Sequence, residues 1–211
     1  MPLGVLIPEN VDGLIVAEKS VSVSNLINGA ARLQPVVMQL GQASGALAAL
    51  AVIEGKSVRK IGVRQLQTEL LEAGCYIMPY LDLKPSDRHF KALQRIGATG
   101  ILRGEGRNIG WSNETWFRAA DPLRGEEIYL DNLLPGFNMA SGEITIGIMM
   151  QLIRGIGAAV PAGQEAVWWE KLGLKDYDPS RPVLRLEAAV VVDAAFDPFG
   201  YFKVDYDGNF R

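Results

Sequence analysis

Residues 35–54 read PVVMQLGQASGALAALAVIE and carry no charge before the final glutamate. Pro35 suits the first turn of a helix, where its missing N–H group costs nothing, so the sequence predicts a helix over this stretch. Gly41 and Gly45 stand four residues apart, with alanines close by. Small residues at that spacing clear one helix face for another backbone or for a ligand. The start of the helix presents free N–H groups and a partial positive charge.

The length of this uncharged run is at the lower limit for a membrane-spanning helix. Gln39, Gln42 and Ser44 interrupt the run, and its two glycines lower its hydropathy. We therefore expect a buried helix of a soluble protein and no membrane span. The chain also opens without the basic start and the long apolar run of a signal peptide.

A short apolar segment precedes the helix. Residues 14–17 (LIVA) lie between Asp12-Gly13 and Glu18-Lys19. An apolar run of this length with polar flanks is typical of a buried strand in a parallel sheet. The strand and the helix together predict an α/β remnant, which we assign as a first domain over residues 1–56.

Residues 14–51 (LIVAEKSVSVSNLINGAARLQPVVMQLGQASGALAALA) resemble the closing motif of a family of FAD-dependent oxidoreductases. The resemblance implies that Arg32 faces the flavin ring or the substrate and that the helix start lines the cofactor. Some members of this family are also labelled xanthan lyases, which implies a carbohydrate substrate and a periplasmic or secreted location. The positions that match the motif are Ser22, Gly29, Arg32, Pro35, Leu40, Gly41, Gln42, Ala43 and Gly45. Of these, the resemblance assigns Arg32, Gly41, Gln42, Ala43 and Gly45 to FAD binding.

The chain departs from the family pattern at two places. Glu18-Lys19 replace a Gly-Arg pair, and Asn25 and Asn28 stand where the family has histidines. A lost histidine removes the group that titrates most readily near neutrality. These changes indicate a divergent or inactive member, and we assign no catalytic residue.

FAD also needs a strand, a glycine-rich turn and a helix N-terminus under its pyrophosphate. No GxGxxG follows a predicted strand, and the glycine-rich residues 100–110 (GILRGEGRNIG) follow a helical pattern instead. We therefore expect the C-terminal part of a flavoprotein, which is not catalytic alone. Its expected partner is the missing N-terminal FAD-binding region.

Residues 57–211 form the second expected domain, and their pattern is mainly helical with short loops. Caps and apolar spacing predict helices over residues 63–72, 86–96, 141–156, 164–172 and 183–195. A long loop is expected between the second and third of these helices, with Trp111 and Trp116 in it. The ending, PFGYFKVDYDGNFR, predicts a C-terminal β-hairpin around Asp207-Gly208, with a strand over residues 201–204 that pairs near Tyr76 or with the N-terminal piece.

Two segments of this domain read as copies of one unit. Residues 89–104 and 115–127 (HFKALQRIGATGILRG, TWFRAADPLRGEE) correspond to residues 165–196 (EAVWWEKLGLKDYDPSRPVLRLEAAVVVDAAF). The order of helix, glycine turn, aromatic–proline loop and Arg-x-Glu resembles the S-layer homology repeat. That resemblance implies a helical bundle that binds cell-wall polysaccharide, with Trp116, Arg124 and Arg185 as carbohydrate-binding candidates. Leu123 and Leu184 replace the threonine of the repeat pattern.

Composition excludes several classes of protein. The chain is 48% hydrophobic with a net charge of −3, and no cluster of basic residues provides a nucleic-acid face. One cysteine, Cys75, and one histidine, His89, cannot build a cysteine or histidine metal cluster, so no metal site is expected.

We therefore expect a mainly α protein, a C-terminal fragment or divergent member of an FAD-dependent oxidoreductase with a helical accessory domain. Two alternatives stay open: a polysaccharide- or cell-envelope-binding module, and an oligomerisation domain in which the apolar helix pairs with another copy.

Overall fold

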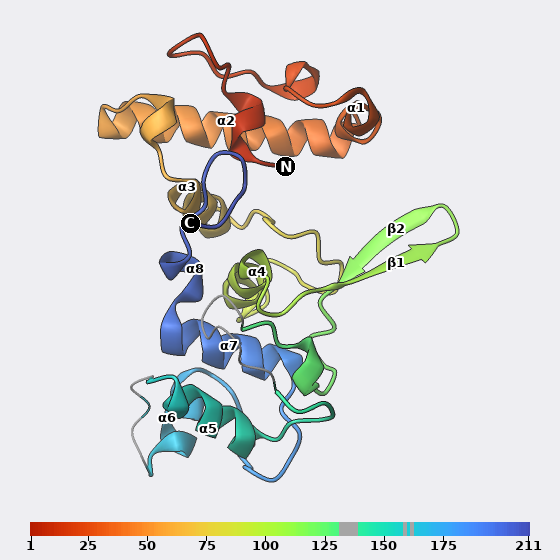
Figure 1. The fold of residues 1–211 in the computed structure, drawn as a ribbon, viewed down its shortest axis with the longest axis vertical. Helices are drawn as coiled ribbons and strands as arrows, with labels where there is room; N and C mark the ends of the chain where they lie inside the picture. The colour runs from red at the N-terminus through yellow and green to blue at the C-terminus, as the bar shows by residue number, and fades with distance from the viewer. Residues whose placement is uncertain (131–138, 158–159, 161–162) are drawn as a thin grey trace. The chain divides into compact units, whose positions relative to one another are not determined.

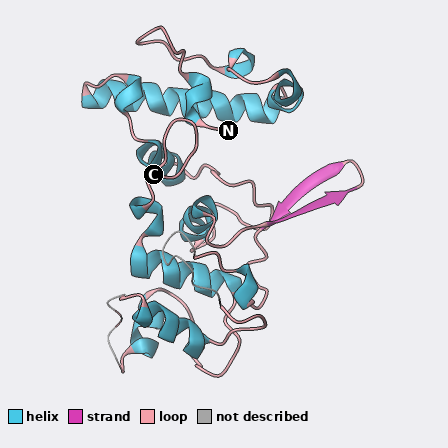
Figure 2. Ribbon diagram, viewed as in Figure 1, coloured by secondary structure: helices cyan, strands magenta, loops and turns pink. Residues whose placement is uncertain are grey.

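The computed structural model describes residues 1–130, 139–157, 160 and 163–211. The chain forms two compact units, in which helices predominate (Figures 1 and 2). Unit 1 contains Met1–Cys75 and Phe202–Arg211, and unit 2 contains Tyr76–Tyr201. Residues 57–75, which the sequence analysis grouped with the second domain, pack within unit 1.

Unit 1 is organised around one long helix, α2. It spans Gln34–Glu54 and ends at Gly55, whose φ of 61° is the left-handed conformation of a helix C-cap. This confirms the helix predicted from the uncharged run. The shorter elements around it are η1 (Leu3–Leu6), η2 (Glu18–Ser20), α1 (Asn25–Ala31), η3 (Val58–Lys60) and α3 (Val63–Glu72).

One stripe of α2 forms the centre of the unit 1 core. Leu47 is fully buried, and it shares a cluster with Leu6, Ile61 and Leu66 from η1, the loop after η3, and α3. Burying side chains of this size stabilises the fold by about 1.5–3 kcal/mol each. The rest of the buried stripe on α2 consists of Val37, Leu40, Ser44, Leu50 and Ala51.

The predicted strand over residues 14–17 is wrong. The segment is irregular, and Leu14 is half exposed. Its connection to η1 is the Val16 N–H, which donates to the Leu6 carbonyl at 2.7 Å. A parallel strand is stable only beside neighbouring strands, and none is present in the described part of unit 1.

Unit 2 contains five helices and a two-stranded hairpin in its described residues. The hairpin joins β1 (Glu105–Ile109) to β2 (Ser112–Trp116) in antiparallel register, through a two-residue turn in which Gly110 has φ of 61°. It corrects the loop expected there. The helices are α4 (Phe90–Thr99), α5 (Ile146–Gly155), α6 (Glu165–Lys171), α7 (Arg185–Phe196) and α8 (Pro198–Tyr201), and one 3-10 turn, η4, covers Gly125–Glu127.

A closed ring of backbone hydrogen bonds joins Leu123, Ile144 and Val183, whose side chains are all buried. The Leu123 N–H donates to Val183 (2.8 Å), the Val183 N–H to Ile144 (3.0 Å), and the Ile144 N–H to Leu123 (3.1 Å). Two residues after each member a helical element begins, namely η4, α5 or α7. The sequence repeat aligned Leu123 with Leu184, one residue away from the ring member Val183, and it contained no counterpart of Ile144. The flanking residues pair as Pro122 with Leu184, Arg124 with Glu143, and Thr145 with Pro182.

This ring explains two shifted helix boundaries. The helix predicted from residue 141 starts at Ile146, because residues 143–145 are extended within the ring, and Thr145 caps it by accepting the Ile148 N–H at 3.3 Å. The helix predicted from residue 86 starts at Phe90, because the Asp87 side chain accepts the Lys84 N–H at 2.7 Å instead of capping a helix.

The C-terminal hairpin is reduced to one antiparallel bridge, Val204 with Phe210, around a turn in which Gly208 has φ of 87°. The expected strand over residues 201–204 is wrong at its start, because Tyr201 is the last residue of α8. The segment joins the N-terminal piece, since the Gly4 N–H donates to the Tyr206 carbonyl at 2.8 Å.

Candidate functional site

The residues predicted to bind FAD lie on α2 and just before it. Gly41, Gln42 and Gly45 are exposed on one side of the helix. Ala43 is half-buried and packs against the unit 1 core instead. Arg32 is exposed at the C-cap of α1, directly before α2 begins. The structure therefore places three of the five predicted FAD-binding residues on one face of α2, and Arg32 lies just before the first turn of that helix.

This side of the helix is the α2 outer face, which we define as Met38, Gly41, Gln42, Gly45, Ala48, Ala49, Val52 and Ile53. It carries no charged residue. Met38, Val52 and Ile53 are 74%, 81% and 79% exposed. An exposed strip of this kind, apolar except for Gln42, is a feature of surfaces that bind another molecule.

The helix also meets a test of length and composition for crossing a bilayer. Among the helices of the described residues, α2 is the one that is long and apolar enough to cross a bilayer. Of its most apolar stretch of 18 residues, 28% is buried inside the protein. A core helix meets the same test. The expectation that the chain has no membrane span stays a prediction.

The α2 outer face can accept a flat ligand but does not enclose one. A Cβ atom added at Gly41 or Gly45 meets no atom within 4 Å, so the helix backbone itself forms the surface there. Leu33 precedes the helix without a side-chain cap. The strands of the described chain are β1 and β2, which pair antiparallel, so the described residues include no strand–turn–helix cradle for a pyrophosphate. The residues present fit one wall of an FAD site and do not fit the whole cofactor.

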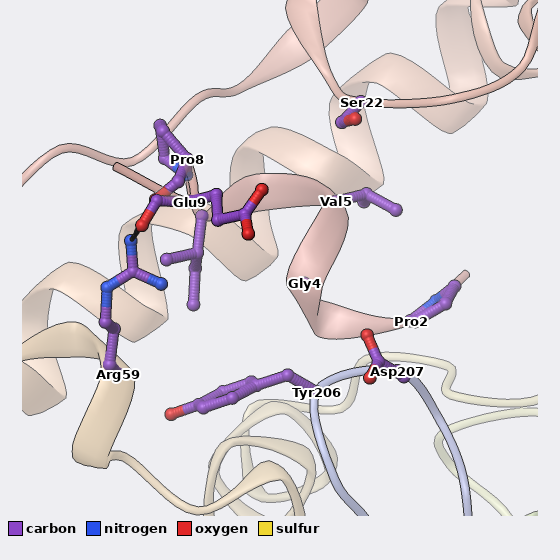
Figure 3. Close-up of a pocket in the computed structure, with 10 residues that line it drawn as sticks. Pro2, Gly4, Val5, Pro8, Glu9, Ser22, Arg59, Tyr206 and Asp207 are labelled. Atoms are coloured by element: carbon purple, nitrogen blue, oxygen red, sulfur yellow. Dashed lines mark hydrogen bonds between the residues drawn. The ribbon is translucent and has the colours of Figure 1, made fainter. Parts of the chain in front are cut away.

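A separate pocket lies elsewhere in unit 1, along η1 (Figure 3). Its volume is about 500 Å³. Figure 3 shows Arg59 and Glu9 at one end, the Tyr206 ring along the base, and Asp207 beside Pro2 at the other end. Its remaining lining residues are Gly4, Val5, Ile7, Pro8 and Ser22.

Tyr206 is fixed in position beneath this pocket. Its hydroxyl group lies 2.7 Å from the Ile61 carbonyl and 3.0 Å from the Val58 carbonyl. Burial raises the pKa of the Tyr206 phenol, although nearby Arg59 opposes that shift. Its backbone carbonyl accepts the Gly4 N–H, and a Cβ atom at Gly4 would lie only 3.0 Å from that carbonyl. Hydrogen bonds at the hydroxyl group and at the backbone carbonyl of Tyr206 therefore both hold its ring in place.

Arg59 closes the end of the pocket that also contains Glu9 (Figure 3). Its Nε donates to the Asp12 carboxylate at 3.1 Å, and its Nη2 donates to the carbonyls of Glu9 (2.8 Å) and Pro8. These bonds fix the turn that carries the Glu9 side chain. In the described part of the chain, the carboxylates of Glu9 and Asp207 and the hydroxyl of Ser22 have no protein partner, so they are available to a ligand.

The three carbohydrate-binding candidates lie in unit 2 and serve different local roles. The Trp116 indole N–H donates to the Glu114 carboxylate at 2.9 Å at the end of β2. The exposed Arg124 pairs with Glu126 at 2.7 Å. Neither contact tests whether Trp116 or Arg124 binds carbohydrate, so both assignments stay predictions.

Arg185, the third candidate, is buried. Its side chain is 2% exposed and pairs with the Glu127 carboxylate at 3.0 Å. Its Nε donates to the Phe117 carbonyl at 2.8 Å and its Nη2 to the Arg103 carbonyl at 2.6 Å. Glu187, two residues further along α7, binds Arg181 and not Arg185. All the contacts of Arg185 hold unit 2 together, and a glycan could reach its guanidinium only if unit 2 opened.

Sequence reasoning missed the pocket along η1. Tyr206 bonds to a carbonyl that lies 145 positions away in the sequence, so no local pattern reveals the contact. The available signal was the aromatic-rich ending itself, because an apolar, aromatic tail outside a helix needs a surface to pack on. In the described residues no group of three histidine, cysteine or acidic side chains is arranged to hold a metal ion.

Comparisons with known proteins add one match. No curated protein and no solved structure matches the chain. Nothing in the comparisons supports an S-layer homology region in unit 2. Residues 1–70, about a third of the chain, match the family model of the FAD dependent oxidoreductases, and this match lies in the part of unit 1 that contains α2.

Proposed function

We propose that unit 1 is the C-terminal wall of the flavin-binding domain of an FAD-dependent oxidoreductase. Its partner would be a polypeptide that carries the glycine-rich dinucleotide motif. The observation that supports this most strongly is the α2 outer face, which is uncharged, exposed and inside the region that matches the family.

The energetics of the outer face favour a partner. Met38, Val52 and Ile53 each gain about 1.5–3 kcal/mol when their exposed apolar surface leaves water. The glycines at positions 41 and 45 let a flat ring or another backbone approach to contact distance, because nothing stands above them. A partner that covered the outer face would therefore gain free energy and would place its own cofactor against α2.

The redox chemistry would belong to the completed assembly. The flavin would accept a hydride from a substrate carbon, and the protein would supply orientation and charge. Arg32 is the exposed cation at the start of α2, and in this proposal it faces the substrate or the flavin ring. The chain alone would be inactive.

A complementation experiment tests the proposal. The chain is co-expressed with the N-terminal, dinucleotide-binding part of a complete FAD-dependent oxidoreductase, and the purified complex is examined for the visible absorbance of oxidised flavin. Gly45→Leu places a side chain on the outer face and should abolish the complex. Glu69→Leu, on the exposed side of α3, adds the same side chain elsewhere and should not. A colourless wild-type mixture, or equal behaviour of the two variants, would refute the proposal.

A second candidate is self-association through the same face. Small residues four apart allow two helices to pack closely, and Ala48 and Ala49 extend the small-residue surface beyond Gly45. Light scattering over a range of protein concentrations separates the two. A mass that doubles with concentration in the wild-type chain but not in Gly45→Leu favours the homo-oligomer.

A further inference from the structure

We propose that the pocket along η1 binds a sugar ring, neutral or carrying an amine, with Tyr206 as its platform and the carboxylates of Glu9 and Asp207 as its hydroxyl acceptors. This site is separate from the α2 outer face and does not depend on flavin. All its residues belong to unit 1.

The pocket has the size and the mixed lining of a small-molecule site. Its volume of about 500 Å³ lies within the range of ligand pockets. Its apolar wall comes from Pro2, Val5, Ile7 and Pro8. The few polar groups among them fix orientation in such sites, whereas the apolar wall supplies contact area.

Tyr206 provides a rigid aromatic surface. Its hydroxyl is engaged with Val58 and Ile61, so its role at the pocket is carried by the ring. An aromatic ring fixed in this way loses little conformational entropy on binding and offers a flat face to the C–H side of a sugar. The Gly4–Tyr206 backbone bond keeps that ring beside η1.

The polar groups that remain available mostly accept hydrogen bonds. An ionised carboxylate only accepts, whereas the Ser22 hydroxyl both donates and accepts. Hydroxyl groups that donate to a carboxylate form bonds about twice as strong as those to neutral acceptors. Glu9 and Asp207 stand at opposite ends of the pocket (Figure 3), so a ligand along η1 needs donors at both ends. A ring that bears several hydroxyls meets this requirement.

The charge of the pocket selects against acidic ligands. Arg59 is already committed to Asp12 and to two carbonyls, which leaves the two carboxylates as the dominant free charges. A neighbouring pocket shares Arg59, Tyr206 and Asp207 and is lined in addition by four basic residues, Lys60, Arg64, Lys203 and Arg211, and by one further carboxylate, that of Asp205. An anion therefore meets more basic groups in that neighbouring pocket than in the η1 pocket. The ligand of the η1 pocket is neutral or cationic.

Saturation-transfer NMR on the full chain tests this with three probes of the same ring size: glucosamine, glucose and glucuronate. We expect saturation of glucosamine and glucose with dissociation constants on the order of 1 mM, and glucosamine the tighter of the two. Amide shifts on binding should include Gly4, whose N–H donates to the Tyr206 carbonyl, and Gly208, which follows Asp207 in the sequence. No saturation of glucose or glucosamine, or tighter binding of glucuronate, would overturn the proposal.

Two exposed substitutions locate the site. Glu9→Gln and Asp207→Asn each keep the shape of the side chain and remove its charge, and each should weaken glucosamine binding about tenfold. Glu69→Gln, an exposed carboxylate of the same unit outside the pocket, should leave it unchanged. All three variants should retain the wild-type circular dichroism and melting curve. Unaltered glucosamine affinity in the Glu9→Gln, Asp207→Asn double variant would show that the sugar binds elsewhere.

Discussion

The Tyr206 hydroxyl lies 2.7 Å from the carbonyl of Ile61, and through this contact the last ten residues of the chain close onto the segment that precedes α3. The family match ends at residue 70, yet the compact unit that contains it also includes Phe202–Arg211. The C-terminal segment is therefore a structural part of unit 1.

The first prediction concerns this contact. Tyr206→Phe keeps the ring but leaves two partly buried carbonyls without the hydroxyl, which should lower the free energy of unfolding by about 1–2 kcal/mol. Hydrogen exchange should become faster at the Gly4 amide, because the Tyr206 carbonyl that it binds is less firmly held. Tyr129→Phe, at a half-exposed site, is the matched control. Wild-type exchange at Gly4 in Tyr206→Phe would contradict the assignment.

The second prediction contrasts two glycines inside helices. A Cβ atom at Gly97, in α4, would overlap the Tyr80 hydroxyl and ring, whereas a Cβ atom at Gly41 meets nothing within 4 Å. Gly41→Ala should stabilise the chain by about 0.5–1 kcal/mol through helix propensity. Gly97→Ala should destabilise it by about 1–3 kcal/mol despite the same gain, because Tyr80 is buried and has little room to move. Urea unfolding measures both, and two shifts of equal sign would contradict the packing.

The third prediction concerns alkaline pH. Burial raises the pKa of Tyr80 from 10.0 to about 12; the nearby Gly104 backbone and the charge of Arg185 oppose the shift, and the charge of Asp82 adds to it. The folded chain thus keeps this proton to higher pH than the unfolded chain, so the stabilisation is complete below pH 10 and is lost as the pH rises to about 12. The total loss should be about 2–3 kcal/mol.

Tyr80→Phe isolates that effect. The Tyr80 hydroxyl has no hydrogen-bond partner in the described structure, so its removal should change stability at neutral pH by less than about 1 kcal/mol. The fall in unfolding free energy between pH 10 and 12 should become shallower by the amount above. An identical fall in the variant would show that other tyrosines carry it.

The fourth prediction separates a buried arginine from an exposed one. Arg185→Met removes one of the two cations that pair with Glu127, the other being Arg118 at 3.2 Å, and leaves two carbonyls without their buried donor, so it should destabilise unit 2 by about 2–4 kcal/mol. Arg124→Met removes a solvent-exposed pair with Glu126 and should have little effect. Thermal melting compares them. Similar melting temperatures for the two variants would contradict the structural role of Arg185.

The sequence predicted elements that depend on local pattern. The uncharged run that starts at Pro35 predicted α2 almost to the residue. The apolar spacing of α3 and α4 did the same within a few positions. Predicted helix boundaries were wrong where a tertiary contact determined the backbone conformation. Residues 143–145 are an example, because the backbone ring holds them extended.

Other features could not be read from local sequence. The β1–β2 hairpin has both faces largely exposed, so its residues show no alternation of apolar and polar side chains. The η1 pocket depends on the C-terminal segment returning to η1 and η3, a contact with no local signature. On α2, spacing correctly placed Gly41 and Gly45 on an open face, but the family pattern also chose Ala43, which faces the core.

A titration of FAD into the purified chain, followed by quenching of flavin fluorescence, tests the central proposal most directly. Because the α2 outer face is one open wall without a pyrophosphate cradle, we expect no saturable FAD binding to the chain alone at FAD concentrations up to about 100 µM. Saturable FAD binding should be seen only when a dinucleotide-binding partner is added. Stoichiometric FAD held by a monomer of this chain alone would contradict the account.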